Sequence, residues 1–282
     1  MDQELQQAVK DALSVGANLK LLPPVCAGNF DGKRLGAKTG GAMEFADYRS
    51  YREGDDLRRI DWQLYARSEQ LMVRRFAQET DPRCDIIIDR SFSMAFYGKN
   101  AAAAGVAALF AKSALNGGFS LQVWELGSSL RKMNAPEEPG LWTFSGEEKE
   151  TFAPEIFEKL RFGLFRNGIR ILISDFFFPL SPGELLKFLD GGSVILIQIL
   201  GREELSPTLS GPVCITDPES GRSRTLRADG EMIERYRTRL ARFQMEYDDA
   251  VRSRNGRFFF FNASELTAHW DVELLCREGV LQ

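Results

Sequence analysis

Three short runs in the sequence carry apolar residues on both faces of an expected strand, and they restrict the fold more than any other feature. They begin at residues 84, 169 and 193 and read CDIIID, IRILIS and SVILIQIL. A strand covered by helices on both faces lacks the apolar–polar alternation of a half-exposed strand. Helix-like segments at 99–115, 154–165 and 182–189 alternate with these runs. The pattern predicts a doubly wound α/β domain with a mostly parallel sheet.

The rest of the chain divides around this domain. Residues 4–22 have helical spacing, and a glycine-rich, highly charged stretch over 27–81 ends in an expected strand at 71–77. We therefore assign residues 1–83 to an N-terminal helix and an irregular or β lead-in subdomain. Residues 84–282 form the α/β domain with its C-terminal extension, which includes a strand at 257–262 that we expect to be buried on both sides.

Composition excludes several classes of protein. Lys and Arg total 36 against 40 Asp and Glu, so the net charge of −4 argues against nucleic-acid binding. The single histidine, His269, excludes a multi-histidine metal centre. The four cysteines are dispersed without a CxxC pair, and no signal-like start is present, so we expect a cytoplasmic protein. No apolar run approaches the ~20 residues of a membrane span, so we expect no membrane insertion.

Polar side chains follow two of the expected buried strands. Asp89, Ser91 and Ser93 come after the first, and Asp175 comes directly after the strand at 169–174. The carboxyl ends of parallel strands meet at one sheet edge. Carboxylate and hydroxyl oxygens select a hard cation, so we expect Mg²⁺, with Mn²⁺ or Ca²⁺ as alternatives, and Asp175 acting through water. Because no evident general base lies beside them, we expect a binding site without catalytic residues.

These residues also carry a resemblance to a known family of domains. Asp89-x-Ser91-x-Ser93 with Asp175 resembles the metal-ion-dependent adhesion site of von Willebrand factor type A domains. That pattern implies a threonine ligand from an intervening loop, for which Thr151 is our choice and Thr143 the second candidate.

A second resemblance lies upstream. The segment EFADYRSYREGDDLRRIDW at 44–62, followed by Ala66-Arg67, is similar to the signature of the bacterial family called domain of unknown function 58. The resemblance implies a lead-in joined to a type A domain. It also implies a non-enzymatic protein that binds a protein partner, often encoded beside MoxR-type AAA+ ATPases and thought to act with them.

Other interpretations of these residues stay open. Asp89 and the two serines can simply cap a strand-to-helix turn, which would leave an interaction domain with a vestigial metal site. A phosphotransferase of the haloacid dehalogenase type would use Asp89 as the nucleophile. It would also need a general acid two residues later, where this chain has Ser91. We interpret the charged block at 47–67 as an ion-pair network with Ile60 and Trp62 buried beneath it.

Overall fold

The computed structural model describes residues 3–23, 43–52, 55–78, 82–144, 154–165, 167–218 and 220–282. The chain forms two compact units, which are described here separately. The larger one comprises residues 1–25 and 82–282, and the smaller one comprises residues 26–81.

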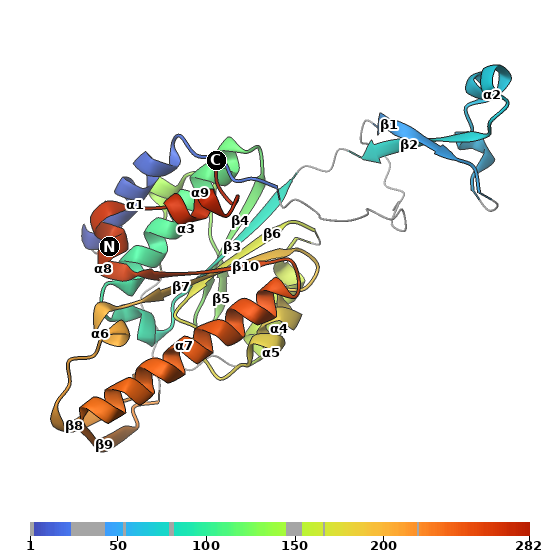
Figure 1. Cartoon of the computed structure of the whole chain (residues 1–282). Helices are drawn as coiled ribbons and strands as arrows, with labels where there is room; N and C mark the ends of the chain where they lie inside the picture. The colour runs from blue at the N-terminus through green and yellow to red at the C-terminus, as the bar shows by residue number, and fades with distance from the viewer. Residues whose placement is uncertain are drawn as a thin grey trace. The chain divides into compact units, whose positions relative to one another are not determined.

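A six-stranded sheet forms the centre of the larger unit (Figure 1). The strand order is β10–β7–β6–β3–β4–β5, and among these described strands every neighbouring pair is parallel except β4 with β5. The strands are β3 (Arg83–Asp89), β4 (Ser120–Leu126), β5 (Leu130–Lys132), β6 (Ile169–Ser174), β7 (Ser193–Leu200) and β10 (Arg257–Asn262). The mixed, mostly parallel sheet confirms the predicted fold class.

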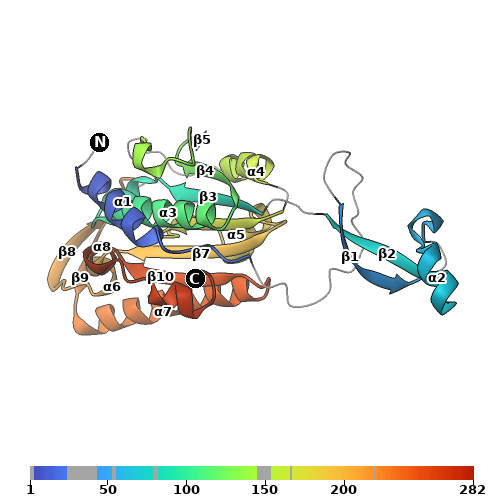
Figure 2. The same cartoon turned by 90° about the horizontal axis from the view of Figure 1, so that it is seen from above.

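Helices cover both faces of this sheet (Figure 2). One face carries α1 (Gln3–Gly16), α3 (Lys99–Asn116), α8 (Ala263–His269) and α9 (Glu273–Arg277). The other face carries α4 (Pro154–Gly163), α5 (Pro182–Phe188) and α7 (Gly230–Arg252). The connections contain α6 (Arg202–Leu205), the short 3₁₀ helices η2 (Phe92–Ala95) and η3 (Pro139–Leu141), and the hairpin β8 (Gly211–Thr216) with β9 (Ser223–Ala228).

The central strands bury both of their faces, as their sequences predict. In β3, Ile86 and Ile88 pack toward α3, whereas Ile87 packs into the opposite core with Leu172 and Leu196. All three isoleucines are 0% exposed. Since side chains alternate across a strand, this burial leaves only the strand ends for polar groups.

The last strand differs from the prediction of burial on both sides. In β10, Phe259 is buried but Phe260 is 49% exposed. The reason is its place in the sheet: β10 is an edge strand whose only described neighbour in the sheet is β7.

The first helix ends earlier than the sequence pattern suggests and lies with the larger unit. Helix α1 ends at Gly16 and packs against α3, where a Cβ on Gly16 would lie 3.2 Å from the carbonyl oxygen of Leu109. The sequence-based assignment places this helix in the same region, residues 1–83, as the lead-in subdomain. Its buried side chains instead join the α3 face of the core.

The smaller unit is an antiparallel pair, β1 (Met43–Ser50) with β2 (Met72–Gln78), joined through η1 (Leu57–Arg59) and α2 (Trp62–Ser68). Ile60 is buried as predicted, and Arg49 pairs with Asp55 at 2.8 Å. The predicted burial of Trp62 is wrong, because its side chain is 59% exposed. Asp61 points inward instead and caps α2 by accepting the N–H groups of residues 63 and 64.

We expect Gly105→Ala to lower the free energy of unfolding by about 1–3 kcal/mol, the usual cost of overpacking a core. A Cβ on Gly105 of α3 would lie 1.9 Å from the buried indole ring of Trp270. Urea unfolding followed by circular dichroism measures the loss. Gly183→Ala is the matched control, because its Cβ would meet no atom within 4 Å. Equal destabilisation of the two variants would contradict this packing argument.

Candidate metal site

The polar strand ends predicted from the sequence do converge on one edge of the sheet. Asp89 is the last residue of β3, and Asp175 directly follows the neighbouring strand β6. Both carboxylates are almost fully buried, at 0% and 1% exposure. Ser91 and Ser93 follow at the start of η2, so all four residues lie where the two parallel strands end.

The Asp89 carboxylate is fixed by two donors. Its Oδ1 accepts the backbone N–H of Ser91 at 2.8 Å, and its Oδ2 accepts the hydroxyl of Ser174 at 2.5 Å. Ser174 Oγ in turn accepts the backbone N–H of Phe176 at 2.8 Å. Ser174 is a site residue that the sequence reasoning missed. Its position as the last residue of a buried strand, next to Asp175, was the signal that could have found it.

The two serine hydroxyls lie side by side. Ser91 Oγ and Ser93 Oγ are 3.1 Å apart. Although Ser91 occupies the N-cap position of η2, its side chain makes no capping hydrogen bond. The capping interpretation therefore accounts for the Asp89 carboxylate, which accepts a local N–H, whereas the Ser91 hydroxyl interacts with Asp89 and Ser93 instead of capping η2.

A buried lysine, which the sequence reasoning also missed, completes this edge. Lys99 is 0% exposed, and its Nζ donates to Asp175 Oδ2 at 2.8 Å and to Glu204 Oε1 at 2.6 Å. The other Asp175 oxygen accepts the N–H of Phe177 at 3.0 Å. Lys99 is the first residue of α3, where the helix dipole disfavours a cation. A lysine opening an alanine-rich helix was thus a sequence signal for a nearby carboxylate.

Burial and neighbouring charge shift the proton affinities of these groups. Burial raises the pKa of Asp89 to about 7, and the nearby charge of Asp175 adds to the rise, while hydrogen bonds from Ser174 and Ser91 oppose it. Burial by itself lowers the pKa of Lys99, but the charges of Asp175 and Glu204 outweigh burial and raise it. Lys99 is therefore a cation at neutral pH.

The two candidate threonines have different outcomes. Thr151 lies outside the described residues. The backbone carbonyl of Thr143 accepts a hydrogen bond from Arg131 Nη2 at 2.6 Å. The ring of the next residue, Phe144, lies 5.5 Å from the guanidinium of Arg90, which directly follows Asp89. The segment around Thr143 thus approaches this edge of the sheet, but in the described part of the chain the Thr143 hydroxyl makes no hydrogen bond to Asp89, Ser91 or Ser93.

Aromatic side chains are exposed on the segments that leave this edge. Phe96 and Tyr97 follow η2 and are 40% and 50% exposed, and Phe177 is 46% exposed. The Phe177 ring lies 5.9 Å from Lys99 Nζ. Phe176 instead points into the core and is fully buried.

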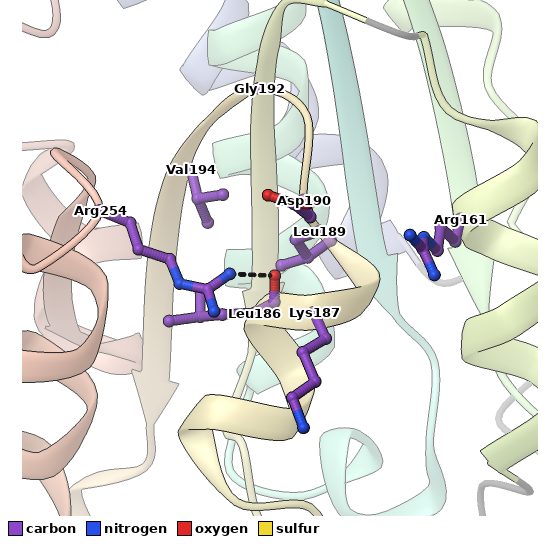
Figure 3. Close-up of a pocket in the computed structure, with 8 residues that line it drawn as sticks. All are labelled: Arg161, Leu186, Lys187, Leu189, Asp190, Gly192, Val194 and Arg254. Carbon is purple, nitrogen blue, oxygen red and sulfur yellow. Dashed lines mark hydrogen bonds between the residues drawn. The ribbon is translucent and has the colours of Figure 1, made fainter.

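A cavity of about 460 Å³ lies far from these residues, beside the amino-terminal end of β7 (Figure 3). Arg161, Lys187 and Arg254 line it, but their side chains point in different directions in Figure 3. Arg254 Nη1 already donates a hydrogen bond to the Leu186 carbonyl at 2.9 Å.

Within the described part of the chain, no three His, Cys, Asp or Glu side chains gather to hold a metal, so a cation at the Asp89 edge depends on hydroxyl ligands.

Comparison with known proteins places the chain in a family. The family model described as "Protein of unknown function DUF58" matches residues 47–246. The chain belongs to this family. The match covers the smaller unit from Asp47 and most of the sheet, and it confirms the resemblance noted for the segment at 44–62.

Individual relatives add little about activity. Uncharacterized proteins of Mycobacterium bovis and Mycobacterium tuberculosis are 25% identical over 213 residues, covering 69% of this chain and 66% of each relative, just under two thirds. Two solved structures are similar at 11% identity. They are the conserved hypothetical protein BatB from Bacteroides thetaiotaomicron (TM-score 0.35, covering 70% of this chain and 99% of that one) and an aerotolerance-related membrane protein from Bacteroides fragilis (TM-score 0.37, covering 66% of this chain and 95% of that one).

In the DUF58 chain, no helix among the described residues is long and apolar enough to cross a bilayer.

We expect the free energy of unfolding of Asp89→Asn to increase relative to that of the natural protein as the pH rises from about 4 to about 7 in metal-free buffer. The folded-state pKa of Asp89, about 7, lies above the ordinary value of 3.8. The native state therefore binds this proton more tightly than the unfolded chain does, and the resulting stability is lost as the pH rises through that window. Asparagine does not titrate, so the variant does not lose this stability as the pH rises.

Urea unfolding in EDTA at a series of pH values measures the effect. The exposed Asp249→Asn on α7 is the control and should follow the natural protein at every pH. Parallel pH profiles for Asp89→Asn and the natural protein would rule out a raised pKa at Asp89.

Proposed function

We propose that this chain is a non-enzymatic interaction module that holds a divalent cation, Mg²⁺ in the first instance, at the Asp89 edge and through it binds a carboxylate of a protein partner. The observation that carries the proposal is the pair of hydroxyls of Ser91 and Ser93, 3.1 Å apart beside a buried carboxylate. Mg²⁺ demands octahedral oxygen ligands at ~2.1 Å, which places adjacent ligands about 3.0 Å apart. The spacing of the hydroxyls suits two neighbouring ligand positions.

The residues would divide the work as follows. Asp89 would supply the charged ligand and Ser91 and Ser93 neutral ones, with a threonine, Thr151 by family resemblance, completing the set. Asp175 would interact with the ion through a water molecule, since N–H donors already occupy both of its oxygens. With so few anionic ligands the bound ion keeps most of its charge and attracts a carboxylate from outside.

The exposed aromatic residues beside the site support a protein as the partner. Phe96, Tyr97 and Phe177 offer apolar contact area on the segments that leave the sheet edge. Large aromatic side chains are the residues that most often supply binding energy at protein interfaces. The family resemblance alone suggests a MoxR-type AAA+ ATPase as that partner.

One observation favours a second candidate, the phosphotransferase. Lys99 is a cation at the same edge as Asp89, and phosphoryl-transfer sites use such cations to stabilise phosphate charge. Two carboxylates already neutralise this ammonium, however, and the residue two positions after Asp89 is Ser91 instead of an acid. The binding module is therefore the better account.

We expect Mg²⁺ to raise the melting temperature of the natural protein and to have no effect on Asp89→Ala. A ligand that binds only the folded state stabilises it by mass action, and Ala removes the charged ligand. Differential scanning fluorimetry with Mg²⁺, Mn²⁺, Ca²⁺ or EDTA measures the shifts. Asp249→Ala, which removes an exposed carboxylate on α7, should respond like the natural protein. A metal response that survives in Asp89→Ala would remove Asp89 from the site.

We expect no hydrolysis of p-nitrophenyl phosphate above the buffer rate when the natural protein is assayed with Mg²⁺. The site offers Asp89 a neutral serine where the phosphotransferase chemistry needs a general acid. Release of nitrophenol, followed by absorbance, is the measurement. Turnover by the natural protein that disappears in Asp89→Asn would make the phosphotransferase the better assignment.

A further inference from the structure

Lys99 is a charged side chain at the candidate site that is 0% exposed, and the proposed function gives it no task. Its ammonium lies between a carboxylate that follows β6 and one on α6, which follows β7. Asp175 directly follows Ser174, whose hydroxyl donates to Asp89 Oδ2 at 2.5 Å, so the Lys99–Asp175 pair lies beside Asp89. The lysine and a cation at Asp89 would therefore draw on the same local negative charge.

We propose that Lys99 is a resident cation that sets how tightly a divalent ion binds at the Asp89 edge. This inference rests on the proposed function, because it concerns the affinity of the same site. Lys99 offsets one of the two negative charges of Asp175 and Glu204, so that the local negative charge left to attract an ion is smaller by one unit. A positive charge beside a cation site also repels the incoming ion, and little solvent screens the two charges when both are buried.

The contacts around Lys99 make this a fixed arrangement. Glu204 uses its second oxygen to accept the N–H of Gly201 at 2.7 Å, which anchors it at the start of α6. A Cβ on Gly201 would lie 2.4 Å from Cβ of Tyr97, so the loop before α3 and the loop after β7 are in close contact. Asp175 is held by Phe177 and by Lys99. Lys99 thus cannot swing into solvent when an ion arrives without breaking two ion pairs.

A weak intrinsic affinity has a consequence for partner binding. If Lys99 lowers the negative charge around the bound ion, a carboxylate from the partner adds negative charge to the site. Ion and partner then strengthen each other's binding, because such coupling is reciprocal. Lys99 would in this way make ion binding depend on the partner.

The test compares metal affinity in variants that change the local charge in opposite directions. Lys99→Met should bind Mg²⁺ or Mn²⁺ at least 10-fold more tightly than the natural protein, because Asp175 and Glu204 lose their counter-ion. Glu204→Gln should bind several-fold more weakly, because it leaves Lys99 with one partner. Lys10→Met, at an exposed lysine of α1, is the matched control and should not change the affinity. Isothermal titration with the metal alone and melting temperatures in EDTA and in excess metal supply the readouts.

The outcomes separate this inference from the proposed function. Metal binding by the natural protein tests the proposed function, whereas the difference between the natural protein and Lys99→Met tests the role of Lys99. Tighter binding by Lys99→Met supports the inference even where the natural protein shows no response. Equal or weaker binding by Lys99→Met overturns it. If Lys99→Met does not fold, Glu204→Gln decides, and an unchanged or higher affinity of that variant overturns the inference.

Discussion

Two carboxylates buried at one edge of a sheet need a compensating positive charge, and the rest of this site follows from that requirement. Asp89 and Asp175 end neighbouring strands whose faces are covered by helices, so neither can turn toward bulk water. Removing one partner of a buried ion pair costs roughly 3–5 kcal/mol, because the other charge is left uncompensated. Lys99 meets the requirement for Asp175 and, through Glu204, ties α3 to the segment after β7.

Asp89 meets the same requirement differently. It accepts hydrogen bonds from Ser91 and Ser174 and forms no ion pair within the described part of the chain, and burial raises its pKa to about 7. In the proposed function, this carboxylate and the two hydroxyls beside it are the groups that would hold the cation. Asp175 is paired with a lysine, whereas Asp89 only accepts hydrogen bonds. This difference makes Asp89 the candidate ligand and Asp175 a structural residue or an indirect ligand.

The comparison of site and sequence shows which interactions a linear pattern reveals. Asp89, Ser91, Ser93 and Asp175 were predictable because strand ends can be counted from apolar runs, and parallel strands place their carboxyl ends together. Lys99 and Glu204 were not found, because the start of α3 and the residue on α6 that pairs with it are separated by 105 residues in the sequence. The prediction that Trp62 is buried beneath the charged block is wrong, because Asp61 occupies the inward position.

The sequence by itself determined the fold class, the order and type of most elements, and the edge of the sheet where polar groups gather, because these follow from local periodicity and chain connectivity. Only the tertiary structure decided that α1 packs on α3, that β10 is an edge strand with an exposed Phe260, and that a buried ammonium shares the site with the acids. These features depend on which surfaces meet after the chain collapses. Contact between distant segments is a property of the packed molecule, and no short stretch of sequence encodes it.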